Sequence, residues 1–371
     1  MMTLDRETLD RRLAALVAAT AKAGLDAAAI VPGSNFQYLT GGRFAAMERP
    51  TILIVTASGE RRAVLPAFEV MTWEKLGFAA EVFPWKDSEG YDRATAAAVA
   101  GLSVKRLGVE GQRMRVFEEI ALVKAIPGVT IVDAHKAISS IRLRKDRHEI
   151  RSMREAIALS EAALEKTLQE IRIGVTEREV ESELLRNLYA GGAREMAFSP
   201  IVLGGAQAAE PHGHAGGYRM QRGDTLLFDF GAAHDGYNAD ITRTVFVGEP
   251  EDDARAFYET VREANLIGRD SVRPGMTAAA VDDAVQRYLE ASPFAASIVH
   301  KTGHGLGLDV HEPPQVMRGD ETVLEPGMVI TIEPGLYVPR LRGVRIEDDV
   351  LVTEGGAESL TRFPRELRVV G

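Results

Sequence analysis

Cysteine is absent from the 371 residues of this chain. Its absence excludes disulfide bonds, thiolate metal ligands and cysteine nucleophiles. Long hydrophobic runs are absent as well, and no apolar stretch approaches the roughly 18 residues that span a bilayer. The charged N-terminus, Met-Met-Thr-Leu-Asp-Arg-Glu, lacks the apolar core of a secretory signal. We therefore expect a cytoplasmic protein without a membrane partner.

Basic residues are fewer than acidic residues in this chain. Lys and Arg number 44 against 54 Asp and Glu, so the net charge is −10 and the isoelectric point is near 5.5. This balance disfavours nucleic acid and anionic membranes as partners, because both bind through basic surfaces. Hydrophobic residues make up 45% of the chain and charged residues 26%, which is typical of a globular protein. The length favours two domains.

Residues 1–140 alternate between strand and helix patterns, which predicts an N-terminal α/β domain. Leu9 and Leu13 recur at helical spacing before Gly24, which can end a helix. The domain has a single histidine, His135, and no cluster of acids with histidines. We therefore expect it to serve recognition or oligomerisation. The other predicted strands and helices cover residues 27–31, 51–56, 61–66, 68–76, 81–85, 106–110, 114–124 and 129–132.

Residues 141–371 predict a second domain, of α+β composition and with an internal duplication. A long amphipathic helix starts near Ile150, and a capping-box signature at Thr176 begins another helix. The same order of two helices recurs about 100 residues later. The motif Arg-x-Gly-x-Thr links the helices in both copies, with Gly174 and Gly275 lying 101 positions apart.

Four acidic residues follow the same repeat. Asp229 and Glu333 each lie six positions after a glycine and are 104 positions apart, and Asp240 and Glu347 lie further along in each copy. Two hairpins related by pseudo-two-fold symmetry would bring these acids together, where like charges raise each other's pKa. Two divalent cations would neutralise four carboxylates, whereas two arginines would not. The arginines near these acids in sequence are Arg243 and Arg345.

Histidines accompany the acids. His304 lies among glycines in Thr-Gly-His-Gly-Leu-Gly, and glycine allows the backbone to approach a site closely. The interleaved histidines make a phosphate-binding loop a poor alternative. Carboxylates with one imidazole suit Mn²⁺, Co²⁺, Fe²⁺ or Zn²⁺. Isolated histidines are more often structural, and we assign that role to His148, His214 and His234.

Four motifs combine these features: Asp-Phe-Gly-x5-Tyr-x2-Asp-Ile-Thr-Arg-Thr, Thr-Gly-His-Gly-Leu-Gly, Thr-Ile-Glu-Pro-Gly-Leu-Tyr and Gly-Val-Arg-Ile-Glu-Asp-Asp. They resemble the pita-bread metallopeptidases, which include Xaa-Pro dipeptidases (prolidases), Xaa-Pro aminopeptidases, methionine aminopeptidases and creatinases. The resemblance is dense from about Ile150 to the C-terminus. Before that it is looser, although Asn35–Gly41 is similar to the creatinase/prolidase N-terminal domain. The implied fold is this α/β domain followed by a pita-bread catalytic domain.

The resemblance implies two bound divalent ions, with Mn²⁺ expected and Co²⁺ or Zn²⁺ as alternatives. The implied metal ligands are Asp229, Asp240, His304, Glu333 and Glu347. Asp240 and Glu347 are expected to bridge both ions, and Glu333 to act also as general base. The implied catalytic residues are His212, His311 and Glu333, and the implied substrate-binding residues are His212, His300, His311, Arg345 and Tyr237.

The implied activity is hydrolysis of the Xaa-Pro bond of short proline-containing peptides by a homodimer. A dipeptidase is expected ahead of an Xaa-Pro aminopeptidase, with another small-amide hydrolase as a further alternative. A binding protein without activity is disfavoured because all five ligands are present. A dipeptidase needs a cation for the carboxylate of its substrate, and Arg318, Arg340 and Arg342 are candidates. One departure from the family pattern, Ala-Glu-Pro-His in place of Ala-Leu-Pro-His, places Glu210 at the expected pocket.

Overall fold

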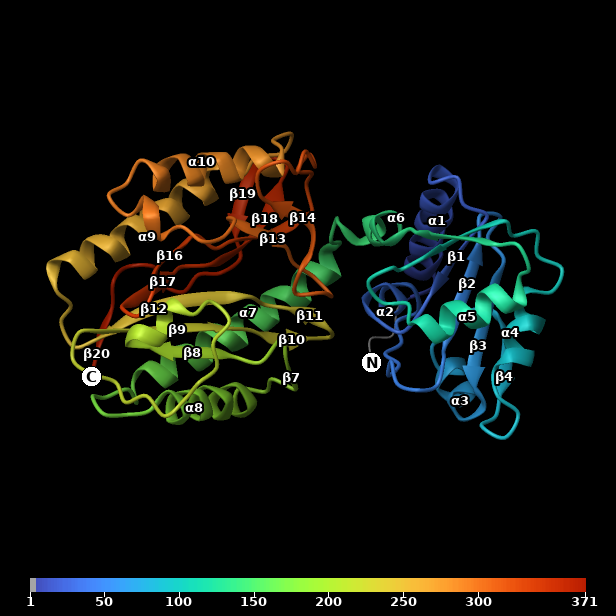
Figure 1. Ribbon diagram of the computed structural model, residues 1–371, viewed down its shortest axis with the longest axis horizontal. Coiled ribbons are helices and arrows are strands. Elements are labelled where there is room, and N and C mark those ends of the chain that lie inside the picture. The colour runs from blue at the N-terminus through green and yellow to red at the C-terminus, as the bar shows by residue number, and fades with distance from the viewer. Residues whose placement is uncertain (1–4) are drawn as a thin grey trace. The chain divides into compact units, whose positions relative to one another are not determined.

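The computed structural model describes residues 5–371, which form two compact α/β units, one ending at Arg142 and the other beginning at Leu143 (Figure 1). Within this described range, no helix combines the length and the apolar character needed to cross a membrane.

The N-terminal unit is a six-stranded sheet between two layers of helices. The strand order is β4-β3-β2-β1-β5-β6, and β1 is antiparallel to β2 and parallel to β5. The strands are β1 (Ala27–Ile30), β2 (Ile52–Thr56), β3 (Arg61–Pro66), β4 (Glu81–Trp85), β5 (Arg106–Val109) and β6 (Thr130–Asp133). The helices are α1 (Arg6–Lys22), α2 (Ser34–Thr40), α3 (Val70–Glu74), α4 (Asp92–Val99), α5 (Val116–Ala125) and α6 (His135–Ser139).

Side chains alternate between the two faces of this sheet, and helices cover both faces, so both are buried. Ala28 and Ile30 of β1 pack with α1 and α2, whereas Ala27 and Ala29 pack with α4 and α5. The segment Asn35–Gly41 falls within helix α2 and its C-cap. Asn35 is buried there, donates to Glu110 at 2.7 Å and accepts from Arg142 at 2.6 Å, so this motif supports the core of the unit.

The first half of the C-terminal unit begins with α7 (Arg147–Leu168) and α8 (Glu177–Ala190). Their apolar faces pack on a four-stranded sheet of order β20-β12-β9-β8. The strands of this half are β7 (Glu195–Met196), β8 (Ile201–Gly204), β9 (Asp224–Phe230), β10 (Ala232–His234), β11 (Tyr237–Asn238) and β12 (Ile241–Val247). The C-terminal β20 (Val369–Val370) joins the sheet beside β12.

The second half repeats this order with α9 (Asp252–Ser271) and α10 (Ala278–Glu290). Their apolar residues pack against a five-stranded sheet of order β14-β13-β15-β18-β19 and against the hairpin β16-β17. The strands are β13 (Gly303–Gly305), β14 (Glu312–Val316), β15 (Val329–Ile332), β16 (Gly335–Val338), β17 (Arg342–Arg345), β18 (Asp348–Thr353) and β19 (Gly356–Ser359). In Figure 1, α9 and α10 lie on one side of the strands and α8 on the other.

The internal duplication extends to individual hydrogen bonds, which recur at matching positions in the two halves. Thr176 and Thr277 are the N-caps of α8 and α10, and each side chain accepts a bond from the backbone N–H three residues on. The amide of Gly174 donates to Met220 at 2.8 Å, and the matching amide of Gly275 donates to Leu324 at 2.9 Å. Both glycines have a positive φ, which a residue with a Cβ rarely adopts.

The two halves meet along β12 and the entry to β18. The amide of Glu347 donates to the carbonyl of Thr242 at 3.0 Å, and the amide of Asp240 donates to the Asp349 carboxylate at 3.2 Å. The ends of the strands that carry the four predicted acids therefore lie next to each other.

Gly231, at the turn after β9, lets the chain approach itself closely. A Cβ at this position would lie 1.7 Å from the carbonyl oxygen of Ala239. We expect Gly231→Ala to lower the free energy of unfolding by about 1–3 kcal/mol and the thermal midpoint by roughly 2–12 °C. Gly217→Ala is the control, because a Cβ there meets no atom within 4 Å. Equal midpoints for the two variants, measured by calorimetry, would contradict this explanation.

Candidate metal centre

The four acids stand at the ends of the central strands. Asp229 lies near the end of β9, directly opposite Thr242 of β12, and Asp240 immediately precedes β12. Glu333 directly follows β15, and Glu347 directly precedes β18. The duplicated fold therefore brings to one place carboxylates that are up to 118 positions apart in sequence.

Ligand atoms of these acids and of two histidines form three overlapping groups. Within each group the atoms lie within 4.8 Å of one another. The groups are Asp229, Asp240 and Glu347; His304, Glu333 and Glu347; and Asp240, His304 and His311. His311 thus lies within reach of the acids, although its predicted role is catalytic.

The electrostatics of this cluster are those of like charges confined in a buried site. Burial, together with the charges of Glu347 and Asp229, raises the pKa of Asp240 well above its usual value. Burial and the charges of Glu333 and Asp229 do the same to the pKa of Glu347. Burial also opposes the charge on Glu333, but the hydrogen bond and charge of His304 outweigh it and lower the pKa of Glu333 to about 2.

The imidazole of His304 is oriented by its neighbours. Its Nδ1 lies 3.1 Å from the carbonyl of Gly305, so Nδ1 carries the hydrogen and donates it. Its Nε2 faces the acids, 3.3 Å from Glu333 and 3.7 Å from Asp240. A carbonyl partner on one ring nitrogen leaves the other available as a metal ligand, which is the usual arrangement for histidine ligands.

Arg345 also enters the cluster. Its guanidinium donates to Asp229, to the hydroxyl of Tyr337 at 2.6 Å and to Thr242 at 3.1 Å, while Thr242 donates to Glu347 at 2.6 Å. An arginine therefore does pair with one of the acids. A single positive charge leaves most of the negative charge of four carboxylates unbalanced.

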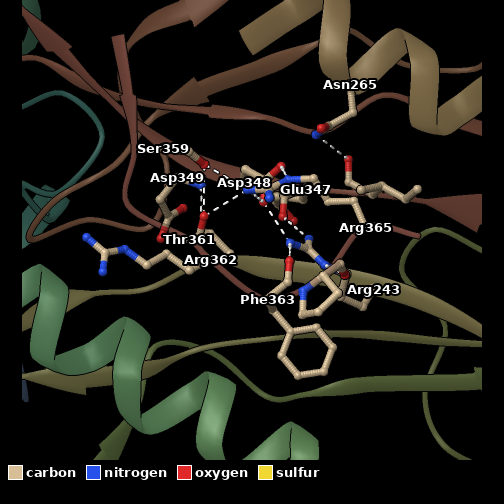
Figure 2. A network of polar contacts seen from close by, with 12 residues as sticks. Arg243, Asn265, Glu347, Asp348, Asp349, Ser359, Thr361, Arg362, Phe363 and Arg365 are labelled. Carbon is tan, nitrogen blue, oxygen red and sulfur yellow. Dashed lines mark hydrogen bonds and ion pairs between the residues drawn. The ribbon is translucent and has the colours of Figure 1, made fainter. Parts of the chain in front are cut away.

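A second arginine, Arg243, binds the chain next to Glu347 and belongs to the network of polar contacts in Figure 2. Arg243 donates to the carbonyl of Glu347 at 2.6 Å, to that of Phe363 at 2.7 Å and to Asp348 at 2.8 Å. Arg365 donates to Asp348 at 2.7 Å from the other side. Burial opposes the charge on Asp348, but Arg243 and Arg365 outweigh it and keep the pKa of Asp348 below its usual value. This network fixes the backbone of Glu347.

A cavity of about 690 Å³ opens onto the acids. It brings together nine of the ten predicted site residues: His212, Asp229, Asp240, His300, His304, His311, Glu333, Arg345 and Glu347. Tyr237, which was predicted to bind substrate, is the exception and does not line this cavity. Tyr237 is buried beside α7, where its hydroxyl donates to Glu149 at 2.6 Å. Glu210 does not line the cavity either; it is exposed, and its charge acts on Glu177.

Two further polar residues line this cavity and were not predicted, Tyr337 and Lys301. Tyr337 is buried and accepts from Arg345, while its hydroxyl lies 2.9 Å from Nε2 of His300. Since Nδ1 of His300 lies 2.7 Å from the carbonyl of Lys301 and must donate, Nε2 accepts from Tyr337. Burial lowers the pKa of His300, which favours this neutral form. Tyr337 lies in the motif Thr-Ile-Glu-Pro-Gly-Leu-Tyr, so the signal was present in the sequence.

The donor set fits divalent cations. Among residues 5–371, Oδ1 of Asp229 is a buried oxygen that accepts no hydrogen bond, although it lies in the cluster of acids. Carboxylate oxygens with one oriented imidazole are ligands that Mn²⁺, Co²⁺, Fe²⁺ and Zn²⁺ accept. Bound cations would also satisfy the charge of Asp240 and Glu347, which burial alone disfavours.

The fold and this site define a metal-dependent peptidase. Residues 151–354 match metallopeptidase family M24, and residues 12–144 match the creatinase/prolidase N-terminal domain. The chain belongs to metallopeptidase family M24. The two-domain architecture and the resemblance predicted from the sequence are thereby confirmed.

Named relatives are similar over most or nearly all of the chain. The probable dipeptidase PepE of Mycobacterium bovis is 37% identical over 99% of this chain and 98% of that protein. The Xaa-Pro dipeptidase of Pyrococcus furiosus is 39% identical over 71% of this chain and 76% of that protein. The solved structure of an Xaa-Pro dipeptidase from Bacillus anthracis is 32% identical, covers 98% of this chain and 100% of that chain, and has a TM-score of 0.90.

The raised pKa values predict that metal binding competes with protons. We expect the thermal stabilisation by Mn²⁺ to be large near about pH 8 and to shrink towards about pH 5.5, because cations must displace protons from Asp240 and Glu347. For the metal-free protein the pH dependence of stability has the opposite sign. Carboxylates with raised folded pKa values stabilise the fold at low pH, and this contribution is lost as pH rises through those values.

Scanning calorimetry with and without Mn²⁺ over this pH range measures both effects. Glu347→Gln removes one of the competing proton sites and should weaken the stabilisation and its pH dependence. Glu354→Gln, an exposed acid on the same part of the chain, is the matched control and should behave as the wild type. If the stabilisation by Mn²⁺ did not depend on pH, Asp240 and Glu347 would not be the metal ligands.

Proposed function

We propose that this protein is a dinuclear-metal Xaa-Pro dipeptidase that hydrolyses short proline-containing peptides. The observation that carries the proposal is the convergence of four carboxylates and His304 on one cavity, with His212, His300 and His311 on its lining. The similarity to proteins named Xaa-Pro dipeptidase over most of the chain supports it.

In this proposal the five ligands are Asp229, Asp240, His304, Glu333 and Glu347, with Asp240 and Glu347 shared between two ions. Each of these two acids belongs to two clusters of ligand atoms, and a carboxylate has two oxygens that could serve two ions. His304 also belongs to two clusters, but only its Nε2 is available as a ligand atom. Mn²⁺ is the proposed metal. When bound, two such ions would lower the pKa of a shared water and polarise the scissile carbonyl.

The side chains of this protein then have separate tasks. Glu333 is a carboxylate beside the proposed metal site that can accept a proton from water and pass it to the leaving nitrogen. His212 and His311 line the cavity and would donate to the substrate carbonyl as negative charge develops. Proline leaves as an imide nitrogen, so the enzyme must deliver a proton to it.

The proposed domains are an N-terminal creatinase/prolidase-like domain, 1–140, and a catalytic domain, 141–371. The homodimer, the cytoplasmic location and the preference for dipeptides stay predictions. An Xaa-Pro aminopeptidase is the alternative activity on the same site.

A substrate panel tests the proposal. Xaa-Pro dipeptides, Xaa-Pro-Xaa tripeptides and proline-free dipeptides are incubated with the Mn²⁺-loaded protein, and products are separated by chromatography. Cleavage of dipeptides at the highest kcat/KM is the expected result. Preference for tripeptides identifies the aminopeptidase, and no cleavage of any Xaa-Pro bond overturns both activities.

Glu333→Ala should lower kcat by about 100-fold or more, because it removes both a ligand and the proposed base. Metal content, measured by atomic emission, should fall as well. Glu321→Ala removes an exposed acid and is the control. Wild-type rates in Glu333→Ala would refute the proposed mechanism.

His212→Ala should lower kcat/KM by roughly 100- to 1,000-fold while metal content stays near that of the wild type, because His212 lines the cavity but belongs to none of the ligand clusters. His214→Ala is a close control, since His214 is exposed two positions away and does not line the cavity. Loss of metal from His212→Ala would instead make it a ligand.

A further inference from the structure

The cavity that contains the acids has very few cationic side chains. Among the described residues that line it, Lys301 and Arg345 are the lysine and the arginine. Arg345 is buried, and its guanidinium is engaged by Asp229, Tyr337 and Thr242. Lys301, in contrast, forms no hydrogen bond or ion pair with an acid of the metal cluster among the described residues, and its ammonium donates to a neutral side chain.

The backbone around Lys301 is held firmly in place. Its carbonyl accepts from His300 at 2.7 Å, and the next amide, that of Thr302, donates to the buried Asp282 at 3.0 Å. The carbonyl of Thr302 in turn accepts from the amide of Glu333 at 2.8 Å. Lys301 thus projects from a segment that is fixed between a proposed substrate histidine and a proposed metal ligand.

The side chain of Lys301 has a neutral hydrogen-bond partner. Its ammonium donates to the side-chain carbonyl of Gln315 on β14. The backbone of Gln315 is held by Asp320, whose carboxylate accepts from the backbone N–H of Gln315 at 2.8 Å. An amide orients the ammonium without neutralising it, so the positive charge stays available to an anion in the cavity.

The arginines that were candidates for this task lie elsewhere. Arg318 is exposed and pairs with Asp283 at 3.0 Å and with Glu290 at 2.8 Å. Arg342 pairs with Asp253 at 3.0 Å. Neither of these two arginines, nor Arg340, is among the residues that line the cavity.

We propose that Lys301 determines specificity by binding the C-terminal carboxylate of an Xaa-Pro dipeptide. This inference rests on the proposed function and deepens it. A dipeptide places its carboxylate one residue from the scissile bond, so the cation that receives it must share the cavity with the metal cluster, as Lys301 does. Charge-assisted bonds of this type are strong in a partly buried site.

The state of the Lys301 ammonium agrees with this role. Burial lowers the pKa of Lys301, while the charges of Glu333, Asp282 and Asp320 oppose that shift. A desolvated ammonium gains more from a carboxylate ligand than an exposed one does, because water no longer screens the pair.

The test compares a dipeptide with its amide. Lys301→Met and wild type are assayed, both loaded with Mn²⁺, on an Xaa-Pro dipeptide and on the same dipeptide with a C-terminal carboxamide. We expect Lys301→Met to raise KM for the dipeptide by roughly 10- to 100-fold with kcat within about twofold, and to leave KM for the amide almost unchanged. Lys301→Arg should restore most of the dipeptide affinity.

Arg318→Gln removes one positive charge outside the cavity and is the matched control, with both KM values expected at wild-type levels. The thermal midpoint and the metal content of each variant distinguish a folding defect from a defect in substrate binding. Lys301→Gln is a second variant, which removes the charge of the side chain but keeps it polar. Equal losses on dipeptide and amide, or no loss on either, overturn this inference. If the wild-type protein cleaves no Xaa-Pro substrate, the proposed function itself is overturned. That outcome is seen in the wild type alone and is therefore distinct from any result of the variants.

Discussion

Repulsion among four buried carboxylates is the constraint on which the catalytic domain depends. Asp229, Asp240, Glu333 and Glu347 are held together by strands that pair with their neighbours over many residues, so the acids cannot move apart. The cost appears as raised pKa values at Asp240 and Glu347. Such a site is stable when cations share it, which agrees with the membership of this chain in metallopeptidase family M24.

Two arginines, Arg345 and Arg243, bind residues at or next to the four acids. Arg345 lines the cavity and pairs with Asp229, whereas Arg243 is not among the lining residues and binds the backbone carbonyl of Glu347 and the carboxylate of Asp348. Neither replaces a metal, because each is committed by several hydrogen bonds to a fixed place. Their hydrogen bonds join the two halves of the domain: Arg345 binds Asp229 and Thr242 of the first half, and Arg243 binds Glu347 of the second half.

Much of this was accessible from the sequence because the determinants are local. The helical stripes, the N-caps Thr176 and Thr277, and the glycines that begin each strand pair have fixed spacings, so the duplication could be predicted from two offsets. Short elements were harder. Helices α2 and α4 were missed because neither has a clear apolar period, and the helix predicted over 68–76 is shorter, with a 3₁₀ turn before α3.

The sequence by itself determined the class of protein and the nine cavity residues that were predicted, since motif identity and order specify them. The tertiary structure alone decided which tyrosine and which cation face the cavity. Tyr237 and Tyr337 both lie in quoted motifs, but one packs on α7 and the other on Arg345. Lys301 faces the cavity while Arg318 and Arg342 pair at a distance from it. The direction of a side chain depends on strand pairing between segments far apart in the chain, and no local pattern encodes it.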